Sequence, residues 1–264
     1  MNGELLALAD KTAREAGAMV RERRDAVTRM AVTATKSTPT DVVTESDTAA
    51  EALIRDRLLG ARPDDGIVGE EGGTTSGTSG VQWVVDPIDG TVNYLYGIPQ
   101  YAISIAATVD GDPAVGVVHN PVNGETWSAT RGGGAFLDGM PIHESGCDRL
   151  DRALVATGFG YDPARRARQA DVLRAVITEV RDVRRAGAAS LDLCAVAMGR
   201  VDAFYERGLG PWDLAAGGLI ATEAGVIVSG IRGQPPGPDF VLAAGPALFD
   251  ELHDLLERLE PDRD

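Results

Sequence analysis

The chain has 264 residues, 44% of them apolar, which is enough to bury a sizeable core. Its 25 Lys and Arg against 40 Asp and Glu give a net charge of −15, which disfavours partners such as nucleic acid or an anionic membrane. No apolar run reaches the roughly 18–20 residues of a membrane span, and the N-terminus lacks the basic and apolar regions of a signal peptide.

The cysteine content indicates a reducing compartment. Only Cys147 and Cys194 are present, so a disulfide framework is not expected. One disulfide between these two residues is the alternative. Together with the missing signal peptide, this predicts a cytoplasmic protein.

The first sixty residues predict two helices with a loop or weak hairpin between them. Apolar residues recur at helical spacing over residues 4–29, and the loop that follows is rich in threonine. Lys36 in this loop either faces a phosphate or is an ordinary turn lysine. The second helix covers residues 44–59, with Thr44 as N-cap and Asp47 at its third position. Asp47 either complements the helix dipole or leans toward a metal.

A short apolar strand then runs into two glutamates, Glu70 and Glu71. Adjacent carboxylates are usually solvated at the surface. This pair, however, comes shortly before the apolar strand at residues 81–85, and antiparallel or neighbouring strands would bring Glu70 to the end of that strand. Residues 73–80 have the composition of a flexible surface loop.

The most informative stretch is WVVDPIDGTVN, residues 83–93. Its β-branched start predicts a buried strand that ends at Asp86 and Pro87, because proline has no amide proton to donate. Asp86 and Asp89 flank a tight turn, so their carboxylates can converge. Two hard oxygen ligands close together suit Mg²⁺, which prefers carboxylates, waters and phosphate oxygens.

A possible anion site follows these carboxylates directly. Gly90 lets the backbone approach a ligand, and a short helix begins at Thr91. The free amides of Gly90, Thr91 and Val92 would then bind a phosphate beside the metal. The alternative is an ordinary turn, in which Asp-Pro and Asp-Gly are common.

The rest of the chain divides into two patterns. Residues 101–137 predict an antiparallel meander, with a hairpin signal at Asn123 and Gly124. From residue 153 onward strands and helices alternate, which predicts an α/β half. Because no linker separates the halves, we expect one continuous domain, residues 1–264, with subregions of about 1–145 and 146–264.

A second motif, GPWDLAAG at residues 210–217, opens a helix in that half. Pro211 suits the first turn. Asp213 would lie beside the positive end of the helix dipole, which keeps a carboxylate ionised. Taken alone, the motif indicates only a helix start.

Together, DPIDGTVN at residues 86–93 and the Trp-Asp-x-x-x-Gly pattern at residues 212–217 resemble the signatures of the inositol monophosphatase family of Mg²⁺-dependent phosphatases. The resemblance covers nearly the whole chain. It implies a layered α-β-α-β-α sandwich of the α/β (α+β) class, with an antiparallel sheet in the N-terminal half and a mixed sheet in the C-terminal half. It also implies a homodimer and inhibition by lithium.

The resemblance assigns a role to each candidate residue. In the family, two or three Mg²⁺ ions are held by the equivalents of Glu70, Asp86, the Ile88 carbonyl, Asp89 and Asp213. Glu70 and Thr91 orient the attacking water, with Asp47 near the metals and Glu71 behind them. The positions expected to bind the substrate are Gly90, Thr91, Ala189, Glu206 and Asp213.

We therefore expect hydrolysis of myo-inositol 1-phosphate, a small phosphorylated polyol, by a metal-activated water. Glu206 fits a polyol hydroxyl, but an acidic residue would also meet the amine of histidinol phosphate. Fructose 1,6-bisphosphate and 3′-phosphoadenosine 5′-phosphate are further alternatives within the family. A regulatory role through a protein partner is the alternative of another class, because some bacterial members are thought to act on the transcription machinery.

Overall fold

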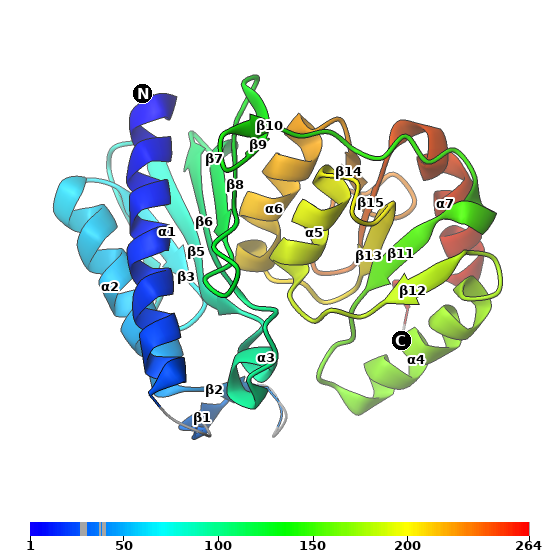
Figure 1. The fold of residues 1–264 in the computed structure, drawn as a ribbon, viewed down its shortest axis with the longest axis horizontal. Coiled ribbons are helices and arrows are strands. Elements are labelled where there is room, and N and C mark those ends of the chain that lie inside the picture. The colour runs from blue at the N-terminus through cyan, green and yellow to red at the C-terminus, as the bar shows by residue number, and fades with distance from the viewer. Residues whose placement is uncertain (27–30, 37, 39–40, 264) are drawn as a thin grey trace.

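Two β-sheets and three layers of helices make up the computed structural model, which describes residues 1–26, 31–36, 38 and 41–263 (Figure 1). Helices α1 and α2 cover the outer face of the first sheet, α5 and α6 lie between the sheets, and α4 and α7 cover the far side of the second sheet. The helices are α1 (Asn2–Asp25), α2 (Glu45–Ala61), α3 (Thr91–Tyr96), α4 (Pro163–Val176), α5 (Ala189–Ala197), α6 (Pro211–Glu223) and α7 (Pro246–Leu259). This arrangement confirms the predicted α-β-α-β-α sandwich.

The first sheet has the strand order β10-β9-β8-β7-β6-β5-β3-β4. Its strands are β3 (Gly66–Gly69), β4 (Gly73–Thr75), β5 (Val81–Asp89), β6 (Ala102–Val109), β7 (Asp112–His119), β8 (Thr126–Thr130), β9 (Gly134–Leu137) and β10 (Met140–Pro141). Strands β6 to β9 form the predicted antiparallel meander. One detail differs from the expected all-antiparallel sheet, because β3 pairs with β5 in parallel.

The second sheet has the order β12-β11-β13-β15-β14 and is mixed, as expected. Its strands are β11 (Leu154–Thr157), β12 (Asp182–Arg184), β13 (Ala203–Glu206), β14 (Ile227–Ser229) and β15 (Val241–Ala244). A separate hairpin pairs β1 (Ala34–Thr35) with β2 (Val42–Val43), and a short 3-10 helix covers Leu150–Arg152.

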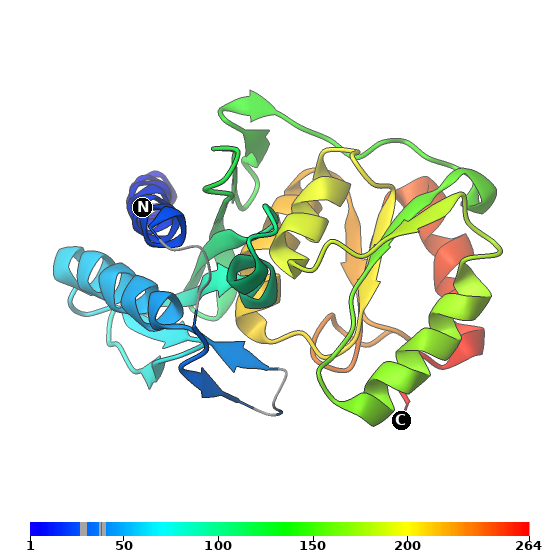
Figure 2. The same cartoon turned by 60° about the horizontal axis from the view of Figure 1, so that its bottom comes forward.

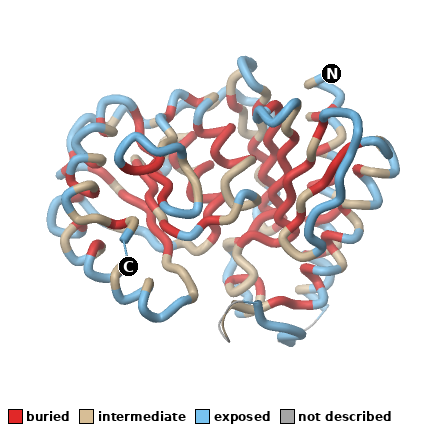
Figure 3. Tube along the Cα trace, turned by 180° about the vertical axis from the view of Figure 1, so that it is seen from behind, coloured by how far each residue is buried: buried red, intermediate tan, exposed pale blue. Residues whose placement is uncertain are grey.

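The first sheet is buried on both faces, which explains the continuous apolar run in β5. Trp83 and Val85 pack into the core beneath α1 and α2, whereas Val84 points into the core shared with α5 and α6. Figure 3 shows the buried residues gathered in the sheets and in the helices between them. The core between the sheets draws residues from both halves of the chain.

Several predicted boundaries need correction. Strand β5 does not end at Pro87 but continues to Asp89, with a shift of register after Asp86 that accommodates the proline. Helix α1 ends at Asp25, and the predicted positions 27–29 lie outside the described residues. Helix α4 ends at Val176 and not near residue 181.

Two expectations from the composition concerned a disulfide and a membrane-spanning helix. Cys147 and Cys194 are both free thiols, so the alternative of a disulfide between them is wrong. Among the described residues, no helix is long and apolar enough to cross a membrane.

Candidate active site

A pocket of about 570 Å³ is lined by residues from both halves of the chain. The β1–β2 hairpin, which contributes to its lining, comes forward in Figure 2. Segments distant in the sequence line the pocket: the hairpin, the end of β5, the loop after β11, the start of α5 and the turn between β13 and α6. The predicted site residues among its lining are Glu70, Asp86, Ile88, Asp89, Gly90, Thr91, Ala189, Glu206 and Asp213. Asp47 is not among the residues that line the pocket.

The parallel pairing of β3 and β5 brings Glu70 beside Asp86. Gly69 is opposite Val85 in the register, so the next residue of each strand emerges at the same edge of the sheet. The Glu70 amide also donates to the Val85 carbonyl at 3.2 Å. Burial raises the pKa of both carboxyl groups, and the charge of Glu70 raises the pKa of Asp86 further.

Three carboxylates from two elements converge at the bottom of the pocket. Oxygen atoms of Asp86, Asp89 and Asp213 all lie within 4.8 Å of one another. Burial raises the pKa of each of the three, and their mutual repulsion raises the pKa of Asp86 and Asp213 further. Asp213 was predicted to remain ionised through the helix dipole, and burial acts on its pKa in the opposite direction.

The carboxylate of Asp89 is held from the opposite half of the chain. The amides of Ala189 and Ser190 at the start of α5 donate to it at 3.2 and 2.8 Å, and the Ser190 hydroxyl donates at 2.5 Å. These bonds and the charge of Arg185 oppose the effect of burial on the pKa of Asp89. Ala189, which was expected to bind the substrate, therefore contacts Asp89 through its amide in this structure.

Asp47 and Thr91 form a linked pair behind the cluster. Thr44 caps α2, and its amide and hydroxyl donate to Asp47 Oδ2 at 2.8 and 2.5 Å, which confirms the predicted capping box. The Thr91 hydroxyl lies 2.9 Å from Asp47 Oδ1 and 3.0 Å from the Ile88 carbonyl oxygen. Because a hydroxyl has one proton, Thr91 keeps an oxygen lone pair and a choice of acceptor.

Gly90 adopts a backbone conformation that few other residues tolerate. Its φ of 91° is left-handed, and a Cβ at this position would lie 2.9 Å from the Gln100 carbonyl oxygen. The turn between the strand and α3 is thereby compact enough to direct the Thr91 side chain back toward Asp47.

Lys36 from the β1–β2 hairpin reaches across the mouth of the pocket. Its Nζ lies 2.5 Å from Glu70 and 2.6 Å from Glu71. Burial alone would lower the pKa of Lys36, but the two carboxylates outweigh burial and raise it. Lys36 is exposed in a bend, as a turn lysine would be, but it also lines the pocket, so both interpretations from the sequence stay open.

The donor set fits a hard divalent cation. Buried carboxylates with no ion pair among them are costly unless they are neutralised by protons or by a metal. The three aspartates supply oxygen ligands only, and the pocket leaves room for waters and phosphate oxygens. Glu70 and the Ile88 carbonyl would hold the remaining positions.

Comparisons with known proteins agree with this chemistry. The profile of the "Inositol monophosphatase family" matches residues 1–260. The "Inositol-1-monophosphatase SuhB" of Mycobacterium tuberculosis is 47% identical, over 97% of this chain and 96% of its own. The "Nus factor SuhB" of Escherichia coli is 40% identical, over 96% of this chain and 99% of its own.

The chain belongs to the inositol monophosphatase family. The crystal structure of the suppressor protein suhB from Bartonella henselae superposes with a TM-score of 0.90 and 35% identity, over 97% of this chain and 99% of that one. Family membership and the names of the relatives support a phosphatase. The acidic groups in the pocket are of the kind that family members use for metal.

The pocket lining also includes the acid Glu206 and the arginines Arg165 and Arg185. Burial and the neighbouring Asp192 raise the pKa of Glu206 to about 8, and Arg185 opposes this shift. The carboxylate of Glu206 packs against Gly158, where a Cβ would clash with it. Near neutral pH, Glu206 is therefore a hydrogen-bond donor as well as an acceptor.

Arg165 and Arg185 are pocket residues that the sequence motifs did not indicate. Arg165 packs between Gly160 and Gly208, and its buried Nε has no hydrogen-bond partner within the described part of the chain. Nothing in the spacing of Arg165 or Arg185 distinguishes them from the other arginines of this chain. Ser190, which holds Asp89, directly follows Ala189, the position that the resemblance placed at the substrate.

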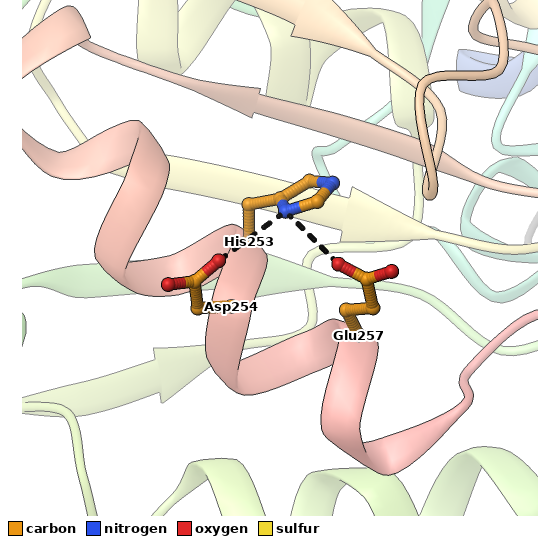
Figure 4. Close-up of side chains that lie close together, drawn as sticks. All are labelled: His253, Asp254 and Glu257. Carbon is orange, nitrogen blue, oxygen red and sulfur yellow. Dashed lines mark ion pairs between the residues drawn. The ribbon is translucent and has the colours of Figure 1, made fainter.

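A second group of possible metal ligands lies on α7, outside the pocket. His253 Nδ1 is 3.8 Å from both Asp254 and Glu257, as Figure 4 shows. These residues are close neighbours on one helix, and Asp254 is exposed. Solvent screens the charges of such partly exposed groups, so we interpret the group as local ion pairing.

Proposed function

We propose that this protein hydrolyses phosphate monoesters with Mg²⁺ and that myo-inositol 1-phosphate is its substrate. The observation that carries the proposal is the buried cluster of Asp86, Asp89 and Asp213 at the bottom of an open pocket. Such a cluster needs a cation, and a cation there would also reverse the repulsion that a net charge of −15 exerts on an anionic ester.

The cofactor supplies the central chemistry: when bound, two or three Mg²⁺ ions lower the pKa of the attacking water and neutralise charge on the phosphate. Glu70, Asp86, the Ile88 carbonyl, Asp89 and Asp213 would hold them. Glu70 and Thr91 orient the water for in-line attack, and Asp47 fixes the Thr91 hydroxyl. The amides of Gly90 and Thr91 donate to the phosphate oxygens.

Glu206 supports a polyol as the leaving group. Because burial raises its pKa to about 8, the protonated carboxyl can donate to one hydroxyl and accept from another. Neighbouring hydroxyls of a cyclitol offer both kinds of partner. Ala189 and Asp213 would border the same ring, and an amine substrate would instead need Glu206 ionised.

The family supports further parts of the proposal. We infer one domain over residues 1–264, a homodimer, sensitivity to lithium and a cytoplasmic location. A core that draws residues from both halves supports the single domain. The charge of −15 argues against nucleic acid and membrane partners.

The test is phosphate release from purified protein with Mg²⁺, with and without EDTA. The esters would be myo-inositol 1-phosphate, histidinol phosphate, fructose 1,6-bisphosphate and 3′-phosphoadenosine 5′-phosphate. We expect metal-dependent turnover with the highest kcat/KM for the inositol ester. A higher value for another ester would keep the metal site and remove Glu206 as a polyol-binding residue, and no turnover of any ester would contradict the proposal.

A second candidate function rests on the relative at 40% identity that is named a Nus factor. A protein partner is compatible with the acidic surface, whereas direct RNA binding is not favoured by it. Substitution of Asp89 separates the two functions. A regulatory role would survive the loss of the metal ligand, and a catalytic role would not.

A further inference from the structure

The turn that carries Glu70 is fastened to α2 by a buried glutamate, Glu51, which is 2% exposed. Its Oε2 accepts from the Glu71 amide at 2.7 Å, and its Oε1 accepts from the Gly72 amide at 2.8 Å. Both carboxylate oxygens are therefore engaged by the two residues that follow the proposed metal ligand.

The local sequence is fitted to this contact. A Cβ at Gly69 would lie 2.3 Å from Glu51 Oε1, and one at Gly72 would lie 2.4 Å from the same atom. The backbone on either side of Glu70 thus passes directly over the carboxylate, an approach that only glycine permits. Glu51 constrains the path of the chain on both sides of the ligand.

Arg55 secures Glu51 from the next turn of α2. Its Nε donates to Glu51 Oε1 at 2.7 Å, and its other nitrogens donate to the Gly73 carbonyl at 2.5 Å and the Thr75 hydroxyl at 3.3 Å. The pair therefore binds the turn after β3 and the strand β4 that follows it. The charge of Glu51 is balanced by Arg55 and leaves Glu70 free to face the pocket.

Glu51 also lies one helical turn after Asp47, on the same face of α2. Asp47 fixes the Thr91 hydroxyl, and Glu51 fixes the turn that carries Glu70. One turn of a single helix therefore sets the spacing between the two groups assigned to orient the attacking water.

We infer that Glu51, held by Arg55, is the positioning residue for the metal ligand Glu70. This inference rests on the proposed function. Glu51 does not line the pocket, and within the described residues its contacts are those of a support for the Glu70 turn. Outer residues that orient ligands commonly change metal affinity by about 10–100-fold when they are substituted.

The test compares Glu51→Gln with the wild type in two measurements that do not depend on turnover. Hydrogen exchange of the metal-free protein should show faster exchange at the amides of Glu71 and Gly72. Calorimetric titration with Mg²⁺ should show binding weakened by about tenfold. Turnover of the inositol ester should recover at high Mg²⁺, which separates a positioning role from a role in the chemistry.

Asp65→Asn is the matched control. Asp65 is also 2% exposed and paired with an arginine, Arg62, but it contacts Trp83 and Ser79 away from the pocket. We expect its substitution to lower the melting temperature and leave the Mg²⁺ affinity unchanged. An equal loss of Mg²⁺ affinity in both variants would reduce Glu51 to general stability and overturn the inference.

Arg55→Gln covers the case in which Glu51→Gln does not fold. Arg55 lies at the rim of this contact, so its loss should be tolerated, with a smaller weakening of Mg²⁺ binding and the same local increase in exchange. Unchanged exchange and affinity in a folded variant would contradict the inference. If the wild type bound no Mg²⁺, that result would contradict the proposed function itself. Normal Mg²⁺ binding by the wild type and by both variants would contradict only the role of Glu51.

Discussion

Among the described residues, two groups of side chains have ligand atoms close enough to hold a metal, and they differ in burial, in composition and in how far apart their members lie in the sequence. Asp86 and Asp89 come from β5 and are buried, Asp213 comes from α6 and is half-buried, and the group contains no histidine. His253, Asp254 and Glu257 are neighbours on α7, partly exposed, and include a group that can become cationic.

The difference shows which acidic cluster requires a cation. The pocket cluster is assembled only by folding, so the fold itself brings the like charges together. The α7 group follows from helical spacing, and solvent screens its charges. Ligand atoms that lie close together therefore indicate a metal site only when they are buried and come from residues distant in the sequence.

The largest effect is expected at the cluster itself. Asp89→Asn should lower turnover of the inositol ester by about a thousandfold or more, because metal stabilisation of transition-state charge is worth several kcal/mol. Asparagine still accepts from the Ser190 amide, so the fold should survive. Steady-state phosphate release measures the loss, and near-normal turnover would contradict the site assignment.

Metal binding should stabilise the wild type and not a variant of the cluster. At about a hundred times its dissociation constant, a ligand adds about 2.7 kcal/mol to the free energy of unfolding. We expect Mg²⁺ to raise the melting temperature of the wild type by several degrees and that of Asp213→Asn by much less. Equal shifts in both proteins would place the binding elsewhere.

Without metal, stability should fall as the pH rises. Burial raises the pKa of Glu206 to about 8, against about 4.3 in an unfolded chain. Between these values the folded state holds a proton that the unfolded state has lost, so the free energy of unfolding decreases with pH and the contribution is gone above about pH 8.

Melting temperatures in EDTA from pH 5 to pH 9 test this, with Glu206→Gln as the comparison. The variant cannot ionise, so its profile should be flatter than that of the wild type. A wild-type melting temperature that rises across this range would show that the carboxyl is ionised in the folded protein.

The smallest effect is expected on α7. Glu257→Gln should change neither the Mg²⁺ dependence of turnover nor the thermal shift with Mg²⁺, because exposed ion pairs contribute about 0–1 kcal/mol. The same calorimetric titration used for the wild type measures this. Loss of a binding event in the variant would show that α7 holds a metal.

The sequence predicted the local parts of the site better than its assembly. The turn at Gly90, the start of α3 at Thr91 and the cap formed by Thr44 and Asp47 follow from short-range rules of glycine and helix ends, whereas the strand continues past Pro87 against the rule for proline. That Glu70 reaches Asp86 depended on a parallel pairing that spacing alone left open.

Other parts required the three-dimensional structure. The pKa of Asp213 was predicted from the helix dipole, but burial and the neighbouring carboxylates have the larger effect. Glu51 lies inside a helix, and only the approach of Gly69 and Gly72 shows what it holds. Arg165 in the first turn of α4 and Arg185 in the loop after β12 reach the pocket through tertiary packing that the sequence pattern does not specify.

The most direct test of the account is the anomalous scattering of a crystal soaked in Mn²⁺, a stand-in for Mg²⁺ with oxygen ligands. The account predicts peaks bounded by Asp86, Asp89, Asp213 and Glu70, and none beside His253 and Glu257. A pocket without Mn²⁺, or a peak on α7 alone, would contradict it.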